Sequence, residues 1–151
     1  MPASEAWMIS TRGRYALRVM VDLAEHSSSG GYIPMKAVAE RQEVSLKYLE
    51  RILPSLTGKG LIEGVQGKGG GYRLTRKPSE YTAYEIVDAA EISISTVACL
   101  EPDAEHCPRS VFCKTLPLWT NLNTITERYL KSITLEDLML GRNLELPDLP
   151  F

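Results

Sequence analysis

Apolar residues in the first sixty positions recur every three or four residues in three separate segments. This spacing places them on one face of a helix, and it predicts helices over residues 11–25, 35–42 and 46–57. Ser45 can cap the third helix through its hydroxyl group. Pro54 lies within that helix, and its missing N–H is expected to kink the helix or to end its regular hydrogen bonding.

The next segment predicts a β-strand, in which Leu61, Glu63 and Val65 alternate with Ile62, Gly64 and Gln66. Residues 72–74 are expected to form the returning strand. Four glycines among residues 67–71 let the tip adopt positive φ angles and bring its backbone close to another molecule. The order helix, turn, helix and hairpin is that of a winged helix-turn-helix, which points to double-stranded DNA as the ligand.

The second half of the chain is predicted to be mostly helical. Thr82 begins a capping-box pattern for a short helix that ends near Ala90. Residues 92–115 show little periodicity and are expected to form a loop, whereas residues 116–132 have the pattern of a long helix. Thr134 is expected to cap a last short helix.

Composition and charge narrow the class of protein. The 151 residues, 44% of them hydrophobic, suit one globular domain or one domain plus an arm. No apolar run is long enough to span a membrane, and the first residues lack the regions of a signal peptide, so we expect a cytoplasmic protein with no membrane partner. Residues 41–77 carry eight basic and three acidic side chains, whereas residues 78–151 carry five and twelve. A solvated surface can give such a count, but its coincidence with the helix and hairpin favours a DNA-binding face.

Polar residues in the first turns of the third helix and along the hairpin are the candidate DNA contacts. A helix in the major groove directs such side chains at base edges, and a basic hairpin meets phosphates or the minor groove. The alternative is an ordinary polar surface helix. The candidate residues are Ser45, Lys47, Tyr48, Glu50 and Arg51 in the helix, and Gln66, Lys68 and Arg73 in the hairpin.

Cys99, Cys107 and Cys113 fall within 15 residues of the predicted loop. Clustered thiolates suit a soft metal or an iron–sulfur cluster, but the spacing also allows redox-active thiols or cysteines with no special role. The two histidines, His26 and His106, lie in predicted loops, and no known catalytic motif is present. We therefore expect that the protein is not an enzyme.

The predicted long helix carries an apolar stripe that forms either intramolecular core or a dimer seam. Helix-turn-helix proteins usually read palindromic operators as two-fold dimers, and a long helix after the DNA-binding module can build the two-fold axis. The candidate dimer residues are Leu118, Leu122, Ile125 and Tyr129.

Four stretches resemble the Rrf2 family of bacterial transcription regulators, whose members include IscR and NsrR. They begin at Ser10 (STRGRYAL), Ser45 (SLKYLE), Gly67 (GKGGGYRL) and Ser132 (SITLEDL), and together they span nearly the whole chain. The resemblance implies a homodimeric winged-helix repressor whose long helix builds the dimer.

The resemblance also bears on the cysteines, because cluster-binding members hold a 2Fe–2S or 4Fe–4S cluster with three cysteines of this loop. The three cysteines of this chain match them. Leu116 stands at the histidine ligand of IscR-type members, and Arg14 stands at the aspartate of NsrR-type members, so both patterns for a fourth ligand are absent. In the hairpin, Gln66 replaces an arginine that reads the minor groove in IscR.

The sequence therefore predicts a homodimeric repressor that binds a palindromic operator and senses iron–sulfur or redox status through the three-cysteine loop. Two alternatives stay open: a cluster-free regulator of the same family controlled by a partner protein or metabolite, and a small metal- or redox-carrying interaction protein. The predicted fold is mainly α with a small β-hairpin wing. It is divided into a winged helix-turn-helix (8–77), a cysteine loop with a dimerisation helix (78–140) and an irregular tail (141–151).

Overall fold

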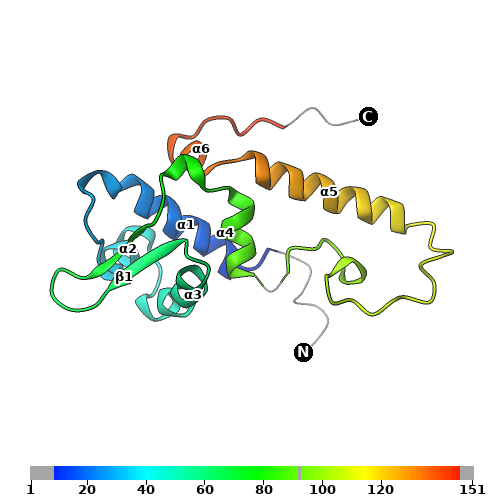
Figure 1. Cartoon of the computed structure of the whole chain (residues 1–151), viewed down its shortest axis with the longest axis horizontal. Helices are drawn as coiled ribbons and strands as arrows, with labels where there is room; N and C mark the ends of the chain where they lie inside the picture. Colours follow the sequence, from blue (N-terminus) through cyan, green and yellow to red (C-terminus); the bar gives the residue numbers. More distant parts are fainter. Residues whose placement is uncertain (1–8, 92, 147–151) are drawn as a thin grey trace.

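The structure is a computed structural model that describes residues 9–91 and 93–146. Its first half contains α1 (Thr11–Glu25), α2 (Met35–Gln42), α3 (Leu46–Gly58) and the strands β1 (Ile62–Val65) and β2 (Gly71–Leu74). Its second half contains α4 (Ala83–Ala90), α5 (Leu116–Ser132) and α6 (Leu135–Leu140), with short 3-10 turns at Ser27–Ser29, Pro78–Glu80 and Ala98–Leu100. The two strands pair antiparallel and form a hairpin at one end of the molecule (Figure 1).

The helices begin where the capping patterns predict them. The Ser45 hydroxyl accepts a hydrogen bond from the N–H of Tyr48 (3.0 Å), and the Thr82 hydroxyl accepts one from Glu85 (3.1 Å). Thr134 begins α6 with a complete capping box. Each cap satisfies a backbone donor that the helix itself leaves free, so local sequence decides these boundaries.

The third helix continues through Pro54 and ends at Gly58, so the proline does not end it. Pro54 is exposed, whereas its neighbours Leu53 and Leu56 are buried in the core. The proline removes only one backbone donor, and the packing of the buried face holds the rest of the helix together.

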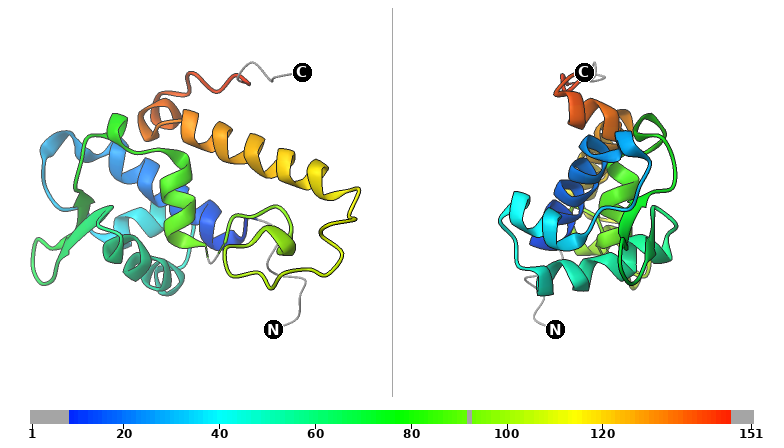
Figure 2. Two further views of the ribbon diagram at one scale, coloured as in Figure 1. Left: turned by 45° about the vertical axis from the view of Figure 1, so that its right-hand side comes forward. Right: turned by 90° about the vertical axis from the view of Figure 1, so that its left-hand side faces the viewer.

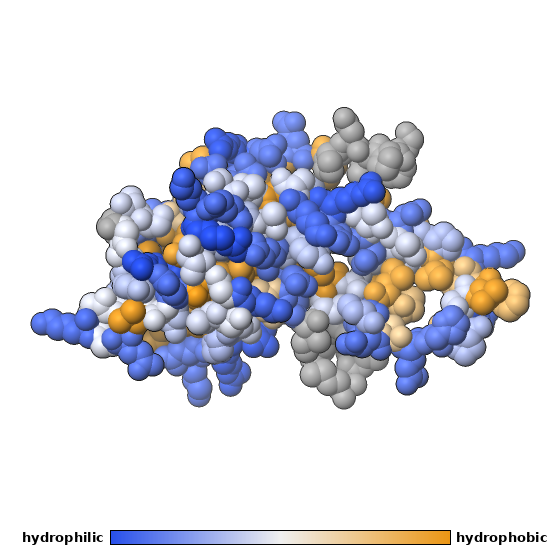
Figure 3. Space-filling view, viewed as in Figure 1, coloured by the Kyte–Doolittle hydropathy of each residue, from blue (hydrophilic) through white to orange (hydrophobic). Residues whose placement is uncertain are grey.

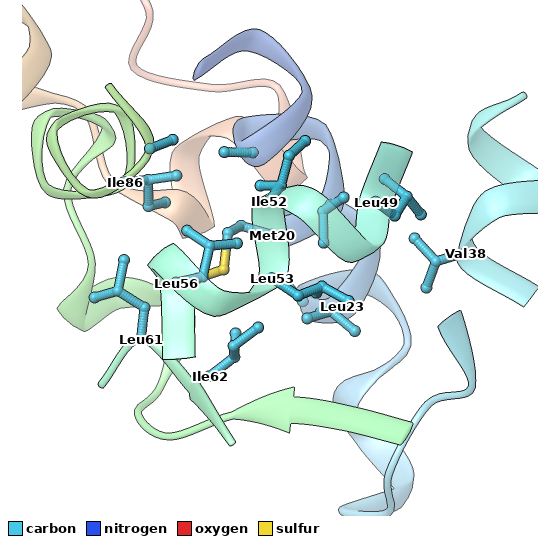
Figure 4. Packing of buried hydrophobic residues seen from close by; sticks show 14 of the residues in the cluster. Met20, Leu23, Val38, Leu49, Ile52, Leu53, Leu56, Leu61, Ile62 and Ile86 are labelled. Atoms are coloured by element: carbon cyan, nitrogen blue, oxygen red, sulfur yellow. The ribbon is translucent and has the colours of Figure 1, made fainter. Parts of the chain in front are cut away.

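One hydrophobic core joins the two halves of the chain (Figure 4). Met20 and Leu23 of α1 pack among the apolar side chains of α3, and Ile62 at the base of the hairpin closes one side. Ile86 of α4 and Leu135 of α6 belong to the same buried cluster. The core therefore extends past residue 77, the predicted end of the winged helix-turn-helix.

The long helix α5 projects from this body and contacts α4 (Figure 1). None of its residues is buried. The preceding loop runs from the end of α4 out to the far end of α5, as Figures 1 and 2 both show. Among the described residues, no helix has the length and apolar character that a membrane crossing requires.

Candidate nucleic-acid interface and cysteine loop

The predicted recognition residues lie at the N-terminal end of α3, where polar side chains face outward. Lys47, Glu50 and Arg51 are exposed. Tyr48 is half-buried, because its ring meets the ring of Tyr15 edge to face with the centroids 5.4 Å apart. Lys47, Glu50 and Arg51 are thus available to another molecule, while Tyr48 also holds α3 against α1.

A buried carboxylate, which sequence reasoning missed, fixes the helix-turn-helix. Asp22 of α1 is 1% exposed and accepts hydrogen bonds from the Arg41 guanidinium (2.7 Å) and from the amide of Gln42 (2.9 Å). Gln42 is also bound by Arg18, whose Nε lies 3.2 Å from the Gln42 side-chain oxygen. Burial raises the pKa of Asp22, but the hydrogen bonds from Arg41 and Gln42 outweigh burial and leave the pKa below its usual value. An acidic residue within the apolar pattern of the first helix was the available signal.

The tip of the hairpin exposes two of the candidate contacts, Gln66 and Lys68. Gly67 and Gly69 between and beside them have φ angles of 95° and 77°, which favour glycine. A Cβ atom on Gly70 would lie 2.3 Å from the carbonyl oxygen of Val65, so the tip can close only without a side chain there. The glycines thus shape a narrow tip that offers one amide and one ammonium group.

Arg73 lies at the base of the hairpin and contacts its own chain. Its Nε donates to Glu63 (2.5 Å), its Nη1 donates to the carbonyl of Gly30 (3.2 Å), and its guanidinium lies 4.5 Å from the ring centroid of Tyr32. These contacts hold the hairpin to the segment after α1. A role for Arg73 in DNA binding stays a prediction, and it would compete with this structural role.

The structure does not bring Cys99, Cys107 and Cys113 into one centre. The first two are exposed and the third is half-buried. Within residues 9–91 and 93–146, no three His, Cys, Asp or Glu side chains converge so that they could hold a metal ion. Leu116 and Arg14, at the two positions where the resemblance implies a fourth ligand, cannot supply one. Three thiolates suit an iron–sulfur cluster chemically, but this arrangement of the loop does not fit one.

The thiol of Cys113 differs from the other two in its surroundings. Its sulfur lies 3.4 Å from the Thr115 hydroxyl. This hydrogen bond, those from the backbone N–H groups of Thr115 and Leu116, and the charge of Arg109 lower the pKa of Cys113. A lowered pKa increases the fraction of reactive thiolate at neutral pH. Val111 and Phe112 beside it are 77% and 83% exposed. Hydrophobic residues gather at the end of the molecule that the loop and the start of α5 form, on the right in Figure 3.

The candidate dimer stripe lies along α5 and is only partly covered. Leu118 and Leu122 are 59% and 42% exposed, whereas Ile125 and Tyr129 are half-buried. The Tyr129 hydroxyl donates to the carbonyl of Leu144 in the segment after α6 (3.0 Å). At least the first two residues of the stripe therefore lie outside the intramolecular core.

Comparison with known proteins identifies the family. The Rrf2 model, described as an iron-dependent transcriptional regulator, matches residues 9–140. The chain belongs to the Rrf2 family. Its relatives are DNA-binding transcriptional regulators rather than enzymes, which confirms the predicted class of protein and the predicted winged-helix fold.

The Rrf2-family relatives cover most of the chain. IscR of Aliivibrio salmonicida is 34% identical over 137 residues, which are 91% of this chain and 80% of that protein. A putative HTH-type transcriptional regulator of Neisseria meningitidis is 35% identical over 89% of each chain. Among solved structures, the global cysteine regulator CymR of B. subtilis matches with a TM-score of 0.71 and 33% identity over 90% of this chain and 98% of its own. T. potens IscR matches with a TM-score of 0.68 and 32% identity over 87% and 85% of the two chains.

Proposed function

We propose that this Rrf2-family regulator is a homodimeric repressor that binds a palindromic operator and senses iron–sulfur or redox status through Cys99, Cys107 and Cys113. The observation that carries the proposal is the position of the cysteine loop relative to the candidate DNA-binding surface. The exposed end of α3 and the glycine tip belong to one packed body, while the thiols lie in an accessible loop that starts from that body. A change in the loop can therefore reach the DNA-binding surface.

The DNA-binding part is tested with a duplex selected from a random-sequence library by the wild-type protein. Lys68→Ala should weaken binding to every duplex, because an exposed ammonium at the hairpin tip neutralises one phosphate. The slope of log K against log salt should fall by about one unit. Fluorescence anisotropy at several salt concentrations measures this slope.

Lys114→Ala is the matched control, since it removes the same charge from an exposed residue of the cysteine loop. Its salt slope should equal that of the wild type. If Lys68→Ala changed the preferred sequence and left the slope intact, the hairpin would be reading bases rather than phosphates.

The dimer is tested on α5. Leu122→Asp would place a carboxylate in the proposed apolar seam, which is costly unless the seam opens, so the variant should sediment as a monomer. Asn121→Asp adds the same charge at the neighbouring exposed position and should leave the dimer intact. A dimer of unchanged strength in Leu122→Asp would exclude this stripe as the seam.

The sensor is tested by isolating the protein without oxygen from iron-replete cells and measuring iron, sulfide and visible absorption. Iron and sulfide in the protein would support a cluster, which requires the loop to close around the three thiolates. Protein without iron or sulfide would contradict the cluster and favour a thiol sensor.

A second candidate is a cluster-free regulator controlled by a partner protein or metabolite. It is favoured by the separation of the three cysteines in the structure and by the likeness to CymR, the global cysteine regulator of B. subtilis. A wild-type protein that binds its selected duplex with one affinity, whether its thiols are free or alkylated, would support this candidate over the first.

A further inference from the structure

Glu91 follows α4 directly and stands at the entrance to the cysteine loop, where its half-buried side chain reaches the first turn of α1. Its Oε1 accepts hydrogen bonds from the N–H groups of Ser10 (2.7 Å) and Gly13 (3.0 Å). The Ser10 hydroxyl lies 2.9 and 3.0 Å from the two carboxylate oxygens. A carboxylate is stabilised at this end of a helix, because the first backbone N–H groups have no partner within the helix.

Gly13 is shaped to receive this carboxylate. It is buried, and a Cβ atom there would lie 2.3 Å from Oε1 of Glu91. Any other residue at position 13 would push the carboxylate away. This explains a glycine inside a helix, a position that otherwise costs stability.

The first turns of α1 contact the recognition helix. Nη2 of Arg12 donates to the carbonyl of Arg51 in α3 (3.2 Å). One turn further, the edge-to-face contact of Tyr15 with Tyr48 joins the same two helices. A shift of the first turn of α1 would therefore displace the N-terminal end of α3, which carries the candidate base contacts.

The loop has a second anchor on the long helix. The N–H of Thr96 donates to the side-chain oxygen of Asn123 in α5 (2.9 Å). Glu91 and Thr96 are five positions apart, so the first residues of the loop connect the N-terminal end of α1 to α5. The C-terminal end of α4 and the start of α1 lie together at the point where the loop leaves the body (Figure 1).

We propose that Glu91 is a positioning residue that couples the state of the cysteine loop to the orientation of the recognition helix. When the loop changes conformation, the carboxylate leaves the first turn of α1, and the contacts of α1 with α3 change with it. The inference rests on the proposed function, in which the loop is the sensor. Such coupling typically changes a ligand affinity about 5- to 150-fold.

The test compares DNA binding before and after the loop is altered chemically. Iodoacetamide is the probe, because all three cysteines are exposed or half-exposed. Fluorescence anisotropy with the duplex selected by the wild-type protein gives Kd for free and alkylated protein. Alkylation should change Kd of the wild type by at least about 5-fold. In Glu91→Ala the change should fall below about 2-fold, which is well under that range.

Two variants and a control separate coupling from a general loss of stability. Glu91→Gln keeps one acceptor oxygen for the N–H groups and should retain part of the response. Gly13→Ala displaces the carboxylate without altering it, and alanine favours the helix, so the protein should stay folded while its response is lost. Glu105→Gln removes the same charge from an exposed loop residue and should respond as the wild type does.

Hydrogen exchange gives a readout that does not depend on DNA. In Glu91→Ala the amides of residues 10–14 should exchange faster, and those at the start of α3 should follow. A responding wild type with an equally responding Glu91→Ala would overturn the role of Glu91 alone. A wild type that binds its duplex but ignores alkylation would overturn the sensor and this inference with it, and a wild type that selects no duplex would overturn the proposed DNA-binding function itself.

Discussion

Tyr81→Phe is expected to loosen the attachment of the hairpin to the body of the protein. Tyr81 is fully buried, and its hydroxyl donates to the carbonyl of Leu61 (2.7 Å) just before β1. The same oxygen accepts from the N–H groups of Thr75 (2.9 Å) and Arg76 (3.0 Å) just after β2. One hydroxyl thus joins the two ends of the hairpin to the segment that enters α4.

The cost of the substitution follows from these three bonds. Phenylalanine fills the same space, so no cavity forms. The N–H groups of Thr75 and Arg76 lose their acceptor in a partly buried site, and the Leu61 carbonyl loses one donor but keeps the Thr75 hydroxyl (3.3 Å). At about 0.5–1.5 kcal/mol for each of the three bonds, the free energy of unfolding should fall by about 1.5–4.5 kcal/mol. This is a large part of the 5–15 kcal/mol typical of a domain.

Urea unfolding at one protein concentration measures the loss, because a dimer's stability depends on concentration. The midpoint should fall while the slope m stays unchanged, since the surface exposed on unfolding is the same. Tyr84→Phe is the control: Tyr84 is half-buried and its hydroxyl has no hydrogen bond to another described residue. Equal losses in the two variants would refute the reasoning, because packing rather than hydrogen bonding would then account for the effect.

Two further predictions concern titration. The lowered pKa of Asp22 means that its pair with Arg41 stabilises the fold above the unfolded pKa of about 3.9 and that this contribution is lost as the pH falls through the folded pKa. The advantage of wild type over Asp22→Asn in urea unfolding should therefore shrink in acid, and a constant advantage would contradict the ion pair. Thr115→Val removes the hydroxyl whose hydrogen bond contributes most to the lowered pKa of Cys113, so alkylation of Cys113 should need a higher pH. Mass spectrometry compares the alkylation of Cys113 with that of Cys107 in the same sample, and an unchanged pH profile would exclude the Thr115 hydroxyl as a cause.

The helices, their starts and the hairpin could be read from the sequence because their causes are local. Ser45 and Thr82 bind N–H groups three residues away, and the apolar positions of each helix follow its period of 3.6 residues. Three of the four glycines at the hairpin tip, Gly67, Gly69 and Gly71, have the positive φ angles that the composition indicates. The resemblance of four short stretches was enough to indicate the family, which the match over residues 9–140 confirms.

The connections between elements were decided only by the tertiary structure. Glu91 binds Ser10 across 81 positions, and Asp22 binds Arg41 across 19, so neither pairing leaves a periodic signal. The side chain of Arg73 is held in both ways. Glu63 is its cross-strand partner within the hairpin, whereas the carbonyl of Gly30 reaches it only after the hairpin has packed against the segment that follows α1.

The cysteine loop shows most clearly what cannot be predicted from the sequence alone. Its composition indicated ligands, but spacing along a chain does not determine distance in space when no regular element connects the residues. Helices and caps depend on contacts within a turn, which the sequence contains. The meeting of distant side chains depends on how the whole core packs, and only the folded chain contains that information.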